Sequence, residues 1–244
     1  MGEQSLRGGF VTAVVRAGNT VRRAQPADPG YVHALLAWFE RQGWDGAPRF
    51  VGTDELGREV LSFIDGHVAW EPAQPSPVTS GASLARVAGL VREFHDLTAG
   101  TPLAAGGEVA CHNDLSPKNT VYCDGGTGLE PVAFIDWDLA APGRRIHDLA
   151  HVCWQYLALG PGSDPAVAGR CMRLICDAYG LPDRGSLLQT ILWWQDRCWR
   201  GIEAKAADGD AAMIRLRDSG APRSVCDAYH WVTSHRAELA ACLR

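Results

Sequence analysis

The sequence predicts an α+β protein of two lobes. Three observations support this class. The residues before position 66 read as short strands around one helix, a Pro- and Ser-rich stretch interrupts the pattern, and nearly everything after position 148 has the apolar spacing of helices. We therefore expect an amino-terminal lobe over 1–66, a linker over 67–81 and a helical lobe over 82–244.

The amino-terminal lobe is expected to be a small antiparallel sheet with one helix on it. Asp28-Pro29 supplies an N-cap with Pro at the first helical position, and apolar residues then recur at helical spacing until Gly43. The turn Ala17-Gly18-Asn19 predicts a hairpin. Strands are expected at Phe10 to Val15, Thr20 to Arg23, Phe50 to Gly52 and Glu59 to Ile64.

The rest of the chain begins with the connector Trp70 to Ser80. An amphipathic helix follows from Leu84 to Phe94, and a second hairpin closes at Gly125-Gly126 before the apolar run Val132 to Ile135. The residues after Asp148 are expected to be almost wholly helical. Five tryptophans fall among apolar neighbours there and are interpreted as packing residues: Trp154, Trp193, Trp194, Trp199 and Trp231.

Composition and charge limit the partners. An apolar fraction of 46% with 21% charged residues is ordinary for a globular protein. A net charge of −5 argues against nucleic acid and is compatible with a cationic small molecule. No window reaches the roughly 18 uninterrupted apolar residues of a membrane helix, and the eight scattered cysteines suggest buried, reduced thiols. We expect a cytoplasmic protein, monomeric or homodimeric, without a membrane partner.

The residues that can carry chemistry are concentrated in one stretch. His112-Asn113-Asp114 is followed by Asn119, and the run Val132 to Ile135 ends in Asp136 and Asp138. A His, two Asp and an Asn at these spacings, on a loop between short strands, can hold a metal and nucleotide phosphates and can receive a hydroxyl proton. The stretch therefore predicts phosphoryl transfer.

The pattern His-x-Asp, four residues, Asn, and then a strand that ends in Asp resembles the loops of the protein-kinase-like phosphotransferases. It is most similar to the aminoglycoside phosphotransferase group, which usually has His-Gly-Asp where Asn113 stands here. The resemblance implies a protein-kinase-like two-lobed fold and Mg²⁺, with ATP or GTP as co-substrate. It makes Asp114 the catalytic base and Asn119 and Asp136 the metal ligands.

The same resemblance implies supporting roles for three further residues. His112 would brace the loop by hydrogen bonding, and the carboxylate of Asp148 would steady it. The alternative for Asp148 is a charge that complements the dipole of the next helix. Asp138 is either a further ligand or a solvated neighbour of Asp136, and we favour the solvated neighbour.

The nucleotide lobe departs from the family pattern. The phosphate loop would fall at Gly8-Gly9, and an Arg replaces the usual Lys. Strand register favours Arg22 over Arg23. The helix of residues 29–42 has no Glu where the partner of that cation is expected, only His33. The purine is expected against the backbone of Ser62, Phe63 and Ile64.

In this family the helical lobe lines the acceptor site, and acidic residues there hold cationic amines. The candidates are Trp193, Trp199, Glu203 and Asp208, with Asp210 and Asp218 as further acidic residues. The alternative is that these charged side chains only form a solvated helix face.

We therefore predict a small-molecule kinase that transfers the γ-phosphate of ATP or GTP to a hydroxyl of an aminoglycoside-like or other antibiotic. One alternative acceptor is a primary metabolite such as choline, homoserine or a sugar. A second alternative is a nucleotide-binding pseudoenzyme. A third is metal-dependent hydrolysis by His112, Asp114, Asp136 and His147, although the chain lacks paired His at ligand spacing.

Overall fold

The computed structural model describes residues 3–6, 14–71, 73–126 and 128–244. The chain forms two compact units, Met1–Asp148 and Leu149–Arg244. The boundary predicted at 67–81 stays a prediction, but His67–Val68 forms a strand, β6, that pairs with the strand β8 (Thr120–Asp124). The first residues of the predicted linker are therefore part of a sheet.

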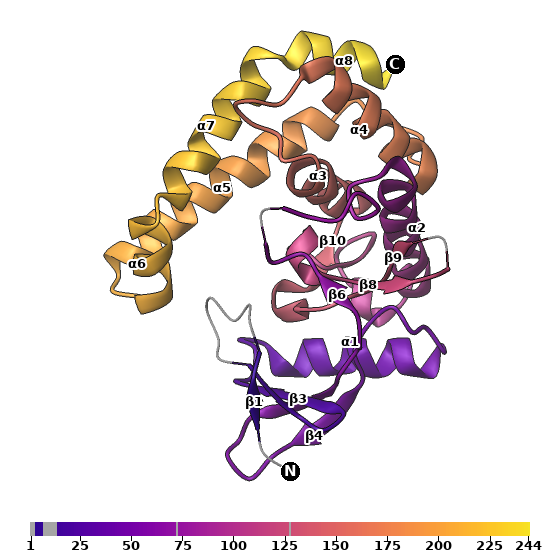
Figure 1. Cartoon of the computed structure of the whole chain (residues 1–244), viewed down its shortest axis with the longest axis vertical. Coiled ribbons are helices and arrows are strands. Elements are labelled where there is room, and N and C mark those ends of the chain that lie inside the picture. The colour runs from indigo at the N-terminus through magenta and orange to yellow at the C-terminus, as the bar shows by residue number, and fades with distance from the viewer. Residues whose placement is uncertain (1–2, 7–13, 72, 127) are drawn as a thin grey trace. The chain divides into compact units, whose positions relative to one another are not determined.

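A five-stranded antiparallel sheet with one helix on it opens the first unit (Figure 1). Its strands, in the spatial order β1-β2-β3-β5-β4, are β1 (Gln4–Ser5), β2 (Val15–Ala17), β3 (Thr20–Arg23), β5 (Glu59–Ser62) and β4 (Phe50–Thr53). The helix α1 (Pro29–Arg41) begins as predicted, since the Asp28 carboxylate accepts the Tyr31 N–H at 3.1 Å. The expected phosphate loop at Gly8-Gly9 and most of the first predicted strand lie outside the described residues.

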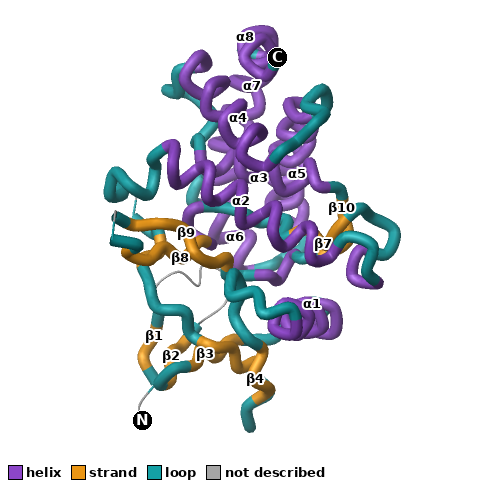
Figure 2. Tube along the Cα trace, turned by 90° about the vertical axis from the view of Figure 1, so that its right-hand side faces the viewer, coloured by secondary structure: helices purple, strands orange, loops and turns teal. Residues whose placement is uncertain are grey.

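The remainder of the first unit contains two smaller sheets and the helix α2 (Gly81–Thr98) (Figure 2). Its strands are β6, β8 (Thr120–Asp124) and β9 (Leu129–Phe134) in one sheet, and β7 (Val109–Cys111) with β10 (Ala141–Gly143) in another. The helix α2 packs against β7 and β9. The hairpin predicted at Gly125-Gly126 is confirmed, because β8 and β9 are antiparallel neighbours on either side of it.

Aromatic side chains join α1 to the core of this unit. The Phe39 ring of α1 lies 5.2 Å from Trp137 and 6.2 Å from Phe94, centroid to centroid. All three side chains are fully buried. Two side chains of α1 also donate to carbonyl oxygens of the region around α2: Tyr31 to Leu103 at 2.8 Å and Trp38 to Leu97 at 2.9 Å. The helix α1 thus packs against and hydrogen-bonds to residues that follow the five-stranded sheet in the chain.

The second unit is helical, as predicted. Its helices are the end of α3 (Arg145–Tyr156), α4 (Pro165–Tyr179), α5 (Leu187–Ala207), α6 (Ala211–Asp218), α7 (Ala221–Ser234) and α8 (Arg236–Leu243). α5 lies along α7, and α4 packs against α8 (Figure 1). Trp154 and Trp231 are buried as expected, whereas Trp193 is 44% exposed. Among the described residues, no helix has the length and apolar character needed to span a bilayer.

Candidate active site

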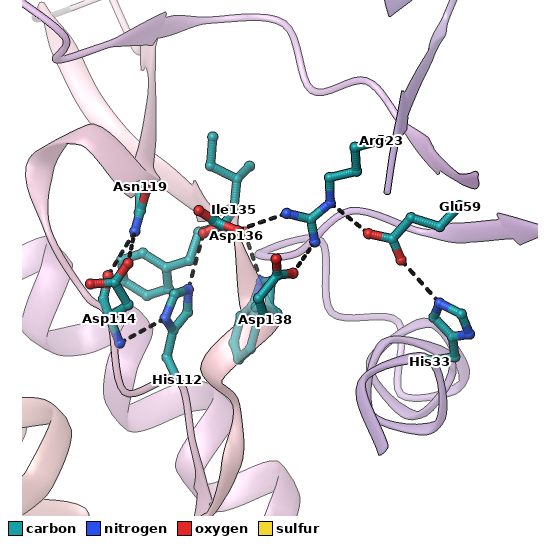
Figure 3. Close-up of polar contacts among 11 residues, drawn as sticks. Arg23, His33, Glu59, His112, Asp114, Asn119, Ile135, Asp136 and Asp138 are labelled. Atoms are coloured by element: carbon teal, nitrogen blue, oxygen red, sulfur yellow. Dashed lines mark hydrogen bonds and ion pairs between the residues drawn. The ribbon is translucent and has the colours of Figure 1, made fainter. Parts of the chain in front are cut away.

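Asp114 lies on the loop between β7 and β8, where Asn119 holds it. The Asn119 side-chain amide Nδ2 donates to the backbone oxygen of Asp114 at 2.8 Å and to its carboxylate Oδ2 at 2.9 Å (Figure 3). The 3₁₀ helix Pro117–Asn119 carries the donor back toward the loop. The contact orients the Asp114 carboxylate, and the carbonyl oxygen of the Asn119 side chain takes no part in it.

The environment of Asp114 favours proton uptake. Burial raises the pKa of its carboxyl group, and the negative charge of Asp136 acts in the same direction. Lys118, His112 and the hydrogen bond from Asn119 oppose the shift without cancelling it. A carboxylate whose pKa is raised toward neutrality is a better proton acceptor than an ordinary surface aspartate.

His112 joins the Asp114 loop to the strand that precedes Asp136. Its ring Nε2 lies 3.1 Å from the carbonyl oxygen of Ile135, and its Nδ1 lies 3.3 Å from the backbone N–H of Asp114 (Figure 3). These contacts fit the tautomer in which Nε2 donates and Nδ1 accepts. The side chain is fully buried, and its ring centre lies 4.5 Å from that of Trp137, with the two ring planes tilted by 49°. His112 is therefore placed to hold two segments together.

The Asp148 carboxylate fixes the backbone just before Asp114. Its Oδ2 accepts the His112 N–H at 2.8 Å and lies 3.0 Å from His95 Nε2, while its Oδ1 accepts the Asn113 N–H at 2.8 Å. Burial alone would raise the pKa of Asp148, but the hydrogen bonds from His95 and the loop hold it below the usual range. Asp148 thus acts on the loop itself, beyond any effect on the dipole of α3.

The backbone conformation explains the Asn at the position where the family usually has Gly. Asn113 has φ of 63°, in the left-handed region that Gly and Asn adopt most readily. Its side-chain amide also donates to the carbonyl oxygen of Leu139 at 2.9 Å. Asn113 therefore keeps the turn that Gly would allow and adds a contact to the segment after Asp136.

Arg23, and not the favoured Arg22, reaches the predicted metal ligands. Its Nη1 lies 2.7 Å from Asp136 Oδ1, and its Nη2 contacts the Asp138 carboxylate (Figure 3). The register that favoured Arg22 was wrong by one residue, and adjacent strand residues point to opposite faces. Arg22 lies instead 3.7 Å from Asp54 and 3.9 Å from Glu3.

Arg23 also has a carboxylate partner that the sequence analysis missed. Glu59 of β5 stands directly opposite Arg23 of β3, and its Oε1 accepts from Arg23 Nε at 2.5 Å. His33 of α1 lies 3.0 Å from the other oxygen, Oε2. The only signal in the sequence was an acidic residue at the start of an apolar strand. The sequence alone does not predict that this strand pairs with β3, so it could not identify Glu59 as the partner of Arg23.

The interpretation of Asp138 as a solvated neighbour was wrong. Its side chain is 31% exposed and pairs with Arg23. Burial raises the pKa of Asp138 to about 6, against the opposing effect of Arg23. One guanidinium faces the three carboxylates of Glu59, Asp136 and Asp138, which leaves two formal negative charges uncompensated. Even if His33 were protonated, one formal negative charge would remain.

This donor set fits a hard divalent cation. Carboxylate and amide oxygens are the protein ligands that Mg²⁺ accepts, and Asp136 and Asn119 present both kinds. Among the described residues, the excess negative charge of this cluster favours a cation beside the carboxylates. Asp136 itself has φ of 66°, a strained conformation for a non-glycine residue that turns the chain sharply after β9.

The predicted purine segment is partly used by the sheet. Ser62 donates its N–H to the carbonyl oxygen of Arg49 at 2.9 Å, and Phe63 donates to the β2–β3 turn at 3.0 Å. Within the described chain, the backbone N–H of Ile64 has no hydrogen-bond acceptor. The Arg16 guanidinium lies 3.6 Å from the centre of the Phe63 ring. Of the three predicted positions, Ile64 is thus the one whose backbone N–H is available, among the described residues, to bind a purine.

The predicted acceptor residues all belong to the second unit and stay predictions. They lie on α5 or at its C-cap: Trp193, Trp199, Glu203 and Asp208. Glu203 and Asp208 are exposed. Arg200 lies 4.3 Å from the Trp199 ring centre, and Arg197 lies 5.7 Å from that of Trp193. Asp210 caps α6 through its carboxylate, and Asp218 pairs with Arg217 at 2.9 Å.

Comparison with known proteins identifies the family of the chain. The model of the phosphotransferase enzyme family matches residues 97–188. The trifolitoxin immunity protein of Rhizobium leguminosarum bv. trifolii is 35% identical over 273 aligned positions, which cover 99% of this chain and 98% of that protein. These matches include the segment from Asp114 to Asp148.

Two solved structures share the fold at low identity. An aminoglycoside phosphotransferase from Streptomyces rimosus is 19% identical, with a TM-score of 0.58 over 78% of this chain and 90% of that one. A choline/ethanolamine kinase family protein from Mesorhizobium loti is 17% identical, with a TM-score of 0.56 over 95% of this chain and 92% of that one.

Fold and site together define an O-phosphotransferase of the protein-kinase-like class. The chain belongs to the phosphotransferase enzyme family.

Proposed function

We propose that this enzyme transfers the γ-phosphate of ATP or GTP to a hydroxyl group of a small antibiotic or toxin, with Mg²⁺. The observation that carries the proposal is the hydrogen bond from Asn119 to the Asp114 carboxylate, beside the pair of Arg23 and Asp136. A proton acceptor and a hard-oxygen cation site thus occur in one place, as phosphoryl transfer requires.

Each residue then has a chemical role. Asp114 accepts the proton of the acceptor hydroxyl as its oxygen bonds to the γ-phosphorus and the bond to the β-phosphate oxygen breaks. Asn119 and Asp136 would hold Mg²⁺, which neutralises phosphate charge when bound. Arg23 would present its guanidinium to the phosphates, and Ile64 would offer its N–H to the purine. His112 and Asp148 keep the loop in place.

The choice of acceptor rests on relatives. The related protein from Rhizobium is named for immunity to a toxin, and neighbours of the fold include aminoglycoside and macrolide phosphotransferases. These names support a protective role against a small toxic molecule. A choline/ethanolamine kinase family protein among the neighbours keeps small amino alcohols as the second candidate class.

A substrate panel tests the proposal. The purified protein is incubated with ATP or GTP, Mg²⁺ and one acceptor at a time: aminoglycosides, a macrolide, trifolitoxin, choline and ethanolamine. We expect release of ADP or GDP with at least one antibiotic or toxin, and a mass gain of one phosphoryl group on it. Turnover on choline or ethanolamine alone would move the enzyme to the second class. Nucleotide binding without turnover on any acceptor would contradict the proposal.

The pH dependence of kcat/KM is expected to show an acid limb from Asp114. Asp114 can act as a base only when it is ionised, so activity should fall as the pH drops through the pKa of its carboxyl group. Because burial raises the pKa of Asp114, the limb should lie above pH 4, about where an ordinary aspartate titrates. The profile is measured for the wild type and for Asp138→Asn, because the pKa of Asp138 is also raised, to about 6. A limb that disappears in Asp138→Asn would assign it to Asp138 instead.

A further inference from the structure

Arg23 keeps a fixed place although α1 offers it no carboxylate. The side chain is 9% exposed, and its Nε donates to Glu59 Oε1 at 2.5 Å. Glu59 is completely buried, and the two residues are direct partners in the antiparallel pairing of β3 with β5. Direct cross-strand partners are held side by side by the backbone ladder itself. The geometry of this ion pair is therefore built into the sheet.

His33 holds the other oxygen of Glu59. Its Nε2 lies 3.0 Å from Oε2, and its ring stacks on Phe50 with centroids 3.6 Å apart and an interplanar angle of 16°. Phe50 belongs to β4, so the ring that contacts Glu59 is itself packed on a strand of the same sheet. With both oxygens engaged, the carboxylate has little freedom to turn away from Arg23 (Figure 3).

The contact with Glu59 decides which edge of the guanidinium faces the site. Glu59 takes the Nε edge, so that Nη1 and Nη2 point toward Asp136 and Asp138. A guanidinium is a rigid planar fork, and fixing one edge fixes the direction of the other. Without Glu59, the Nε edge would lose its fixed partner, and the guanidinium could rotate away from the direction that it now has.

We propose that Glu59 is the positioning residue of the nucleotide site. It replaces, from strand β5, the acidic partner that α1 does not supply, and His33 locks it in place. Glu59 acts through Arg23 and touches no phosphate itself. The inference rests on the proposed function, because it assigns Arg23 to the nucleotide.

The test compares nucleotide affinity in Glu59→Gln and the wild type. The change keeps the shape of the side chain and removes its charge. We expect the Kd for Mg²⁺–ATP, from calorimetry, and the nucleotide KM to rise about 10- to 100-fold, as for the loss of one charge-assisted hydrogen bond. The KM of the acceptor should stay unchanged. His33→Phe, which keeps the stacking on Phe50, should also raise the nucleotide KM, but by a smaller factor than Glu59→Gln.

A double variant distinguishes a positioning role of Glu59 from a general disturbance of the fold. In Arg23→Met, adding Glu59→Gln should change nucleotide affinity no further, because a residue that acts through Arg23 has nothing left to position. Asp54→Asn is the matched control, because it weakens an ion pair of the same lobe, to Arg58 at 2.8 Å, in the turn that joins β4 to β5. It should leave the nucleotide KM unchanged.

The outcomes are distinct. Unchanged affinity in Glu59→Gln, or an equal loss with and without Arg23, overturns the inference while nucleotide binding by the wild type stands. If the wild type binds no nucleotide, the proposed function fails first and the inference with it. If Glu59→Gln does not fold, His33→Phe decides: an unchanged nucleotide KM in that variant overturns the inference.

Discussion

Asp114→Asn is expected to lower kcat strongly and to leave nucleotide binding intact. The amide keeps the size of the side chain and an oxygen for the Asn119 hydrogen bond, but it cannot accept the proton of the acceptor hydroxyl. General-base catalysis typically contributes about 10²- to 10⁴-fold, and kcat should fall by a factor in that range. Steady-state kinetics with the acceptor identified by the panel give kcat, and calorimetry gives nucleotide affinity.

The same substitution at a solvent-exposed aspartate is the control. The side chain of Asp45 is 95% exposed, and its ion pair within the described part of the chain is with Arg49, four residues along. Asp45→Asn should therefore match the wild type in kcat and in affinity. If Asp114→Asn retained the kcat of the wild type, Asp114 would not be the base, and the transfer would run without one.

Asp148→Ala is expected to cause the largest loss of stability. The carboxylate is completely buried and holds the N–H groups of His112 and Asn113 together with the ring of His95. Its removal leaves buried donors without an acceptor, which costs about 3–5 kcal/mol of unfolding free energy. For a chain of this size the melting temperature should fall by roughly 6–20 °C. Thermal unfolding followed by circular dichroism measures the shift.

A helix cap of the second unit provides the comparison. The Asp164 carboxylate accepts two backbone N–H groups at the start of α4, from Ala166 and Val167, but it does so at the surface. Because water replaces the lost hydrogen bonds there, Asp164→Ala should cost only about 1 kcal/mol. Equal shifts in the two variants would mean that burial of Asp148 adds nothing to its contribution.

The catalytic loop was predictable because its signal is local. Asp114, Asn119 and Asp136 lie within one hairpin and its approach, so their spacing along the chain largely sets their spacing in space. The N-cap at Asp28 was equally local, and it begins α1 where predicted.

The ion-pair cluster was not predictable, because it depends on strand register. Arg23 is 113 residues from Asp136 and 36 from Glu59 in sequence. A slip of one residue exchanges Arg22 for Arg23 and turns the wrong side chain toward the site. The same cluster pairs Asp138 with Arg23, which no pattern near Asp138 indicates. The acceptor residues of α5 depend on the substrate, and they stay predictions.

The attachment of α1 has a consequence for how the enzyme is controlled in the cell. In switchable kinases the corresponding helix moves between an active and an inactive position. Here such a movement would pull Phe39 from the aromatic core and break the hydrogen bonds of Tyr31 and Trp38. The cost, on the order of several kcal/mol, would leave the displaced state in well under about 1% of molecules. We expect an enzyme that needs no activating event, so that its activity in the cell is set by how much of it the cell makes and is present before the first molecule of its substrate arrives.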